Sequence, residues 1–211
     1  MEAMGSRCKG RGLAEAISSL GRASSWQAAV ALFLSAMQRE DGTQLPGLSA
    51  WNAVLTACGR GQRWREALAF LCALRSSPRG PVPDVVTYTA AVHACGLGGA
   101  WEASFAVVEE MRDRAVTPNT FTHSSLLTAC ERGRQWARAV HFLTELRASG
   151  VQLHVASFGA VLSACEKGRQ WPLALALLAE MLELGLEPNV IVCSAAVSAC
   201  EKGQQWERAL R

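Results

Sequence analysis

The sequence predicts an all-α fold, an α-solenoid (superhelix) in which antiparallel helix pairs of about 35 residues stack one on the next. Three observations predict it: a regularly repeated cysteine and tryptophan, apolar residues at helical spacing, and glycine or proline where each helical segment ends. Strand-like alternation of apolar and polar residues is absent from the sequence.

The repeat is clearest in five cysteines, each followed six residues later by a tryptophan. They are separated by 37, 35, 35 and 35 residues and comprise Cys58, Cys95, Cys130, Cys165 and Cys200. Trp26, with Leu20 in the cysteine position, indicates a degenerate copy upstream. The predicted organisation is an N-terminal tail (1–9), a degenerate repeat (10–47), four repeats (48–84, 85–119, 120–154 and 155–189) and a truncated repeat (190–211). Because residue 211 falls early in a second helix, we expect a longer parent array.

The segment that ends at each cysteine is predicted to be the first helix of its repeat. Trp51, Val54, Leu55 and Cys58 have the spacing of one buried helical stripe. The stripe recurs, less strongly in the last repeat, at Phe158, Val161, Leu162 and Cys165 and at Cys193, Ala196, Val197 and Cys200. The glycines that follow, Gly133, Gly168 and Gly203, are expected to close this helix in the left-handed conformation.

The tryptophan opens the second helix of each repeat. Trp171, Ala174, Leu175, Leu178 and Met181 form its stripe in one repeat, and Pro172 suits the first helical turn. The second helices are expected to end near Gly150 and Gly185, and the turns into the next repeat are marked by Pro83-Asp84, Pro118-Asn119 and Pro188-Asn189. Neither helix can bury its stripe alone, so successive pairs must stack.

Composition and spacing exclude several functional classes. The net charge of +3 is too small to identify a partner, and the apolar runs 28–34 and 173–179 are too short to cross a membrane. No CxxC pair exists, and the four histidines lack metal-binding or catalytic spacing. We therefore expect no catalytic residue, metal, cofactor, membrane or small-molecule substrate, and we interpret the cysteines and tryptophans as core residues.

Three columns of residues lie away from the apolar stripe. Positions within a repeat are counted from its first residue, which is Leu48, Val85, Thr120, Val155 or Val190. The fifth position is small or polar in Asn52, Thr89, Ser124, Gly159 and Ser194. The second position is apolar in Val86, Phe121, Ala156 and Ile191, and the thirteenth is basic in Arg60, Arg132, Lys167 and Lys202 but not in Leu97. Apolar groups suit a flat base, and one cation per repeat suits one phosphate per nucleotide. Close helix approach and a solvated charged loop are the alternatives.

A 35-residue helix pair that opens with Val-Val-Thr-Tyr-Thr (residues 85–89) and closes with Pro-Asn resembles the pentatricopeptide repeat (PPR) family. The resemblance covers residues 48–211 and, more weakly, 10–47. It implies that the fifth and last residues of a repeat read one RNA base while second-position side chains sandwich it. It assigns Asn52 with Asp84 to uracil and Thr89 with Asn119 to adenine. Ser124 with His154 has no assignment, Gly159 has no side chain to read with and leaves Asn189 alone to favour adenine, and Ser194 lacks its partner.

The same resemblance implies weak, sequence-selective binding of single-stranded RNA containing 5′-U-A-N-A, with Val86, Phe121, Ala156 and Ile191 against the bases. The phosphates would meet Arg60, Arg132, Lys167 and Lys202. It also implies a role in RNA processing, stability or translation in a mitochondrion or chloroplast, together with other RNA-processing proteins. The residues leave one alternative open, a protein-binding helical-repeat scaffold, because solenoids serve both purposes.

Overall fold

The computed structural model describes residues 2–23, 25–38, 46–78 and 80–204, with side chains from residue 12 onward. These residues contain α-helices and no strand, which confirms the predicted all-α class. They divide into two compact parts, residues 1–119 and residues 120–211, called here the N-terminal and C-terminal blocks.

The helices alternate between first and second helices of the repeats. In the N-terminal block they are α1 (Glu2–Arg22), α2 (Trp26–Met37), α3 (Leu48–Arg60), α4 (Trp64–Ser76), α5 (Val85–Leu97) and α6 (Trp101–Asp113). In the C-terminal block they are α7 (Thr120–Arg132), α8 (Trp136–Ala148), α9 (Val155–Lys167), α10 (Trp171–Glu183) and α11 (Val190–Lys202). Residues 2–9, expected to be a tail, instead continue α1.

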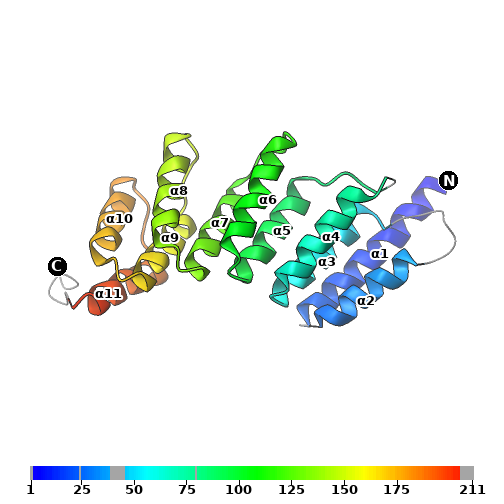
Figure 1. Cartoon of the computed structure of the whole chain (residues 1–211), viewed down its shortest axis with the longest axis horizontal. Coiled ribbons are helices and arrows are strands. Elements are labelled where there is room, and N and C mark those ends of the chain that lie inside the picture. Colours follow the sequence, from blue (N-terminus) through cyan, green and yellow to red (C-terminus); the bar gives the residue numbers. More distant parts are fainter. Residues whose placement is uncertain (1, 24, 39–45, 79, 205–211) are drawn as a thin grey trace. The chain divides into compact units, whose positions relative to one another are not determined.

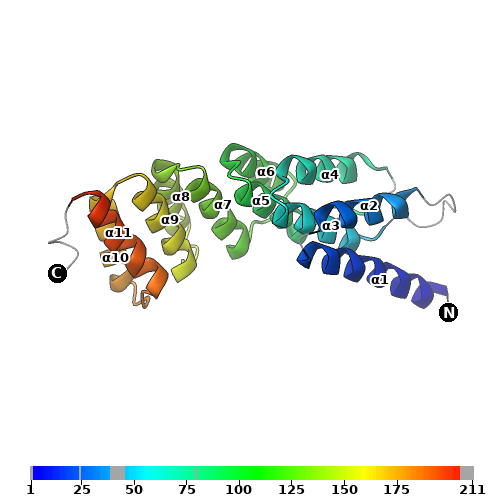
Figure 2. The ribbon, with the colours of Figure 1, turned by 90° about the horizontal axis from the view of Figure 1, so that it is seen from below.

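Within each block the first helices stack on one another. α1 packs on α3 and α3 on α5; in the C-terminal block α7 packs on α9 and α9 on α11 (Figures 1 and 2). Within each block, a second helix that is followed by another first helix lies against the first helix of its own repeat and that of the next, as α4 does against α3 and α5. A repeat therefore buries its apolar surface partly against its successor, as expected for stacked helix pairs.

The apolar stripes are buried as predicted in the complete repeats. Trp51, Val54, Leu55 and Cys58 are at most 2% exposed, and the five recurrent cysteines are all fully buried. The prediction is wrong for the last repeat, where Cys193 is exposed and Val197 is 51% exposed. In an earlier repeat the residue at the Cys193 position contacts the second helix, as Trp51 does with Phe70 of α4. After α11, residues 205–211 lie outside the described residues.

The expected reason for the glycine after each first helix is wrong. Gly168 and Gly203 have right-handed φ values of −85° and −87°, and the left-handed residues are the ones that follow, Arg169 and Gln204. A Cβ at Gly203 would lie 2.2 Å from Cδ1 of Trp171. Glycine is needed there because the indole ring of the preceding repeat occupies the space of a side chain.

The same contact joins successive repeats elsewhere and explains the conspicuous tryptophans. A Cβ on the glycine would approach Cδ1 of the preceding tryptophan to 2.6 Å at Gly61 and Trp26, 2.3 Å at Gly98 and Trp64, and 2.4 Å at Gly168 and Trp136. These tryptophans are half-buried rather than fully enclosed. Left-handed glycines occur at Gly99, one residue beyond Gly98, and after the second helices at Gly150 and Gly185, near the predicted ends.

Candidate nucleic-acid interface

The last residue of each repeat is the residue that precedes the next first helix, and the side chains of Asp84 and Asn189 cap the helix that follows them. Asp84 accepts a hydrogen bond from the backbone N–H of Thr87 at 2.9 Å, and Asn189 accepts one from Val192 at 3.0 Å. Both satisfy an N–H group that has no partner within the helix itself. The capping geometry fixes where these two side chains lie relative to the preceding repeat.

Asn52 and Asp84 are brought together through one hydroxyl. Oγ1 of Thr87 lies 2.7 Å from Oδ1 of Asn52 and 2.9 Å from Oδ1 of Asp84, so its single proton is shared between two acceptors. Within the described residues, the Asn52 amide nitrogen and the second Asp84 oxygen make no hydrogen bond. A donor and an acceptor from the predicted reading pair therefore remain available.

Val192 contacts both Gly159 and Asn189, just as Thr87 contacts both Asn52 and Asp84. An added Cβ at Gly159 would meet Cγ2 of Val192 at 3.6 Å, and the backbone of Val192 is capped by Asn189. Thr87 and Val192 are third residues of their repeats. This position, which also holds Thr122 and Ser157, is at most 2% exposed throughout. Sequence reasoning missed it, although three of its five residues carry a hydroxyl, the other two being Ala50 and Val192.

The remaining predicted reading residues differ in accessibility. Thr89 is 6% exposed, whereas Ser194 on α11 is exposed. Ser124 is half-buried and His154 is exposed, and no hydrogen bond within the described residues joins them. Asn119 is exposed directly before α7. Asn52 with Asp84 is thus the predicted pair whose connection is most fully described.

The second-position residues are exposed in spite of being apolar. Val86 is 58% exposed, Phe121 58% and Ile191 67%, and Ala156 is also exposed. Large apolar side chains are normally buried, so a recurrent exposed one at the same helical position indicates a surface for a partner.

The basic thirteenth-position residues differ in whether a carboxylate pairs with them, and both lysines are paired. Nζ of Lys167 lies 2.9 Å from Oε1 of Glu131, and Nζ of Lys202 lies 2.7 Å from Oε1 of Glu166. Burial raises the pKa of Glu166, but hydrogen bonds from Lys202 and Ser198 outweigh it and hold that pKa below its ordinary value. Contact of these lysines with phosphate remains a prediction that requires exchange of an ion pair.

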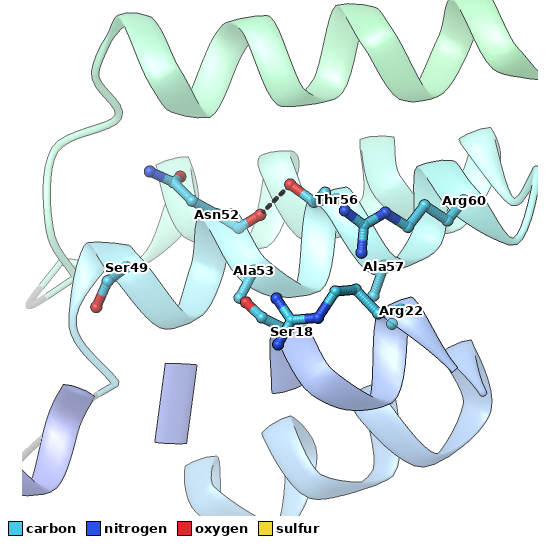
Figure 3. Close-up of a pocket in the computed structure, with 9 residues that line it drawn as sticks. Ser18, Arg22, Ser49, Asn52, Ala53, Thr56, Ala57 and Arg60 are labelled. Atoms are coloured by element: carbon cyan, nitrogen blue, oxygen red, sulfur yellow. Dashed lines mark hydrogen bonds between the residues drawn. The ribbon is translucent and has the colours of Figure 1, made fainter. Parts of the chain in front are cut away.

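Arg60, in contrast to these lysines, makes no ion pair within the described residues. It lines an open pocket of about 370 Å³ between α1 and α3 (Figure 3). Asn52 and Thr56 line the same pocket, as does Arg22 of α1. Arg22 is the thirteenth residue of the degenerate repeat, which sequence reasoning missed because that repeat lacks the cysteine. Arg132 is exposed at the end of α7.

Other kinds of site find no support in the described part of the chain. Its histidines, cysteines and carboxylates form no cluster of three or more that could hold a metal ion. Among the helices that the structure describes, none has both the length and the apolar character needed to cross a bilayer.

Comparison with known families and structures identifies the repeat. The model of the "PPR repeat family" matches residues 83–132, that of the "Pentatricopeptide repeat domain" residues 141–202, and that of the "PPR repeat" residues 49–77. No curated protein sequence matches the chain.

Solved structures of the same architecture are similar to the chain. PPR10 in complex with an 18-nucleotide psaJ RNA element is 29% identical with a TM-score of 0.76. PPR10 from maize is 27% identical with a TM-score of 0.67. In both comparisons the match covers 94% of this chain and 28% of PPR10. The PPR domain of Arabidopsis thaliana protein-only RNase P 1, in complex with tRNA, shares the fold at 18% identity and a TM-score of 0.60, over 74% of this chain and 83% of that domain.

Proposed function

The chain belongs to the pentatricopeptide repeat family, and from this premise we propose that it binds single-stranded RNA with sequence selectivity. Its role is in RNA processing, stability or translation, in a mitochondrion or chloroplast and with other RNA-processing proteins, and without catalysis by these repeats. RNA is the ligand in the PPR10 complex, which the chain resembles over 94% of its length.

One observation carries the proposal: the Asn52–Thr87–Asp84 connection lies beside an exposed apolar side chain at Val86. The side chain of Val86 offers a flat base an apolar contact, and the second oxygen of Asp84 offers an acceptor for the uracil N3–H. Thr89 with Asn119 supplies the predicted adenine pair in the same block. Stacking and edge contacts each contribute modestly, so selectivity is expected to be weak over so few repeats.

A shift assay at fixed ionic strength tests this proposal with short RNAs. RNA containing 5′-U-A-N-A is expected to bind more tightly than oligo-C of the same length, because base contacts rather than charge produce the difference. Asn52→Ala, Thr89→Ala and Asn119→Ala are expected to reduce the preference. Equal binding of both RNAs by the native chain overturns base reading, and unchanged partner binding by the three variants is the result expected of a protein scaffold.

The contribution of the apolar column is tested separately. Val86→Ser is expected to weaken RNA binding several-fold without lowering stability, because the side chain is already 58% exposed. Val82→Ser is the matched control, since Val82 is 82% exposed outside the second-position column. Equal affinity of the two variants would contradict base sandwiching at Val86.

A further inference from the structure

The pocket between α1 and α3 combines two arginines with neutral hydrogen-bonding groups. Its polar lining residues are Ser18, Arg22, Ser49, Asn52, Thr56 and Arg60. Figure 3 shows the two arginine side chains running back along their helices, with the Arg60 guanidinium beside Thr56 and the Arg22 guanidinium beside Ser18. Among the residues that the structure describes, no carboxylate lines this pocket and neither arginine makes an ion pair. The pocket is therefore a concentration of positive charge.

The residue at the twelfth position of the preceding repeat explains why Arg60 is not neutralised. Glu131 and Glu166 hold this position in the C-terminal block and pair with the lysine of the following repeat. Gly21 and Gly59 hold it in the first two repeats. A Cβ at Gly21 would lie 2.9 Å from Cβ of Ala57, so glycine also permits the close approach of α1 to α3. Glycine at position 21 therefore has two effects: it leaves Arg60 without a carboxylate partner, and it lets the two helices that carry the arginines pack closely.

The first repeat supplies charge without the means to read a base. Its fifth and last residues are Ala14 and Gly47, whose side chains offer no hydrogen-bonding group. Arg22 is nevertheless retained at the thirteenth position. Recognition of a phosphate, rather than of a base, is the contribution that this repeat can make.

We propose that Arg22 and Arg60 bind a terminal phosphomonoester of single-stranded RNA in this pocket; the RNA part of this inference rests on the proposed function. A phosphomonoester carries about −1.5 to −2 charges near neutral pH, which two guanidinium groups match, whereas an internal phosphodiester carries one. The planar guanidinium can donate two parallel hydrogen bonds to phosphate oxygens. The Ser18 hydroxyl lies in the same lining and adds a neutral donor.

The test uses fluorescence anisotropy at constant ionic strength with one RNA sequence in three forms: 5′-phosphorylated, 3′-phosphorylated and with two hydroxyl ends. We expect a phosphate at one end to tighten binding about tenfold over the unphosphorylated form, and the two arms identify which end. Arg22→Gln and Arg60→Gln are each expected to remove that increment while leaving the preference for 5′-U-A-N-A over oligo-C. Inorganic phosphate is expected to compete for the increment alone.

Lys167→Gln is the matched control, because it removes one positive charge at the same helical position from a lysine that is paired with Glu131. It is expected to leave the terminal-phosphate increment unchanged. Far-ultraviolet circular dichroism and melting curves check that every variant is folded. No increment at either end in the native protein, or an equal loss for all three RNA forms in the arginine variants, overturns the proposal; the second result indicates an internal phosphodiester.

Failure of this inference is distinct from failure of the proposed function. Selective binding of the unphosphorylated RNA with no end effect removes the phosphomonoester site and leaves base reading intact. An absence of sequence preference together with an end effect removes base reading and leaves the arginine site.

Discussion

The Thr87 hydroxyl is 2.7 Å from the amide oxygen of Asn52, although the two residues lie 35 positions apart in successive repeats. The contact links the fifth residue of one repeat to the helix that its own last residue, Asp84, caps. Two side chains assigned to one base thus share a third residue as their support. The orientation of this reading pair depends on the repeat that follows it.

Thr87→Val removes this shared hydroxyl at nearly constant volume. We expect the preference for uracil at the corresponding base to fall severalfold and the free energy of unfolding to fall by about 1 kcal/mol, since a buried hydrogen bond is lost. Thr144→Val is the control, because among the described residues the exposed Thr144 hydroxyl donates its hydrogen bond to the backbone carbonyl of His141 in its own helix. Binding of RNAs that differ only at that base measures the effect. An unchanged uracil preference would show that Thr87 is a packing residue.

Gly159→Thr is expected to create the threonine and asparagine pair that the family resemblance assigns to adenine, with Asn189 as its second member. The site has room, because the new Cβ would meet Val192 only at an ordinary contact distance of 3.6 Å. We expect tighter binding of RNAs with adenine at that base. Gly159→Val is the isosteric control without a hydroxyl. A gain of the same size for both variants would contradict hydrogen-bonded reading at this position.

Gly98→Ala tests the contact between repeats. The new methyl group would lie 2.3 Å from Cδ1 of Trp64, so the ring or the helix must move, and we expect a loss of about 1–3 kcal/mol in stability. Arg169→Gly is expected to have the opposite sign, because Arg169 has a left-handed φ of 55° that favours glycine. Chemical denaturation measures both. A neutral Gly98→Ala variant would mean that the tryptophan contact contributes little.

The buried thiols predict how stability changes in alkaline solution. Burial raises the pKa of Cys58 to about 11, with a smaller contribution from Glu66, and burial raises the pKa of Cys95 to about 12. Their unfolded forms lose the proton near pH 9, whereas the folded forms keep it, so the free energy of unfolding should fall as the pH rises from about 9 to 12. Below pH 9 these thiols give no such dependence.

Thiol labelling checks the same assignment residue by residue. At pH 8 we expect the exposed Cys72 and Cys193 to react rapidly and the buried cysteines to react only on unfolding. Peptide mass spectrometry after timed labelling distinguishes the positions. Rapid labelling of Cys95 in the folded protein would contradict its burial.

The architecture was predictable because it depends on spacing within a helix and between repeats. The stripe through Trp51 and Cys58 and the turn at Pro83-Asp84 follow from local chemistry that a short window of sequence contains. The interpretation of Gly203 failed because its neighbour Trp171 lies in another repeat, and glycine alone does not reveal which ring approaches it.

The candidate interface was less predictable than the helices. The columns at the second and fifth positions follow from helical geometry, but the support from Thr87 depends on contacts across a repeat boundary. The pairing of Lys202 with Glu166 could have been anticipated, because an acid and a base 36 residues apart are neighbours in a 35-residue repeat. Arg22 was overlooked because its repeat lacks the marker cysteine.

The contact between Trp64 and Gly98 has a consequence for synthesis of the chain on the ribosome. The indole of one repeat gains its cover only when the next first helix has emerged and docked. Stability should therefore accumulate in steps of about one repeat, with each step trailing translation by one helix pair. A pause in translation at a length where residue 77 but not residue 98 has emerged from the ribosome would leave that aromatic surface exposed to chaperones.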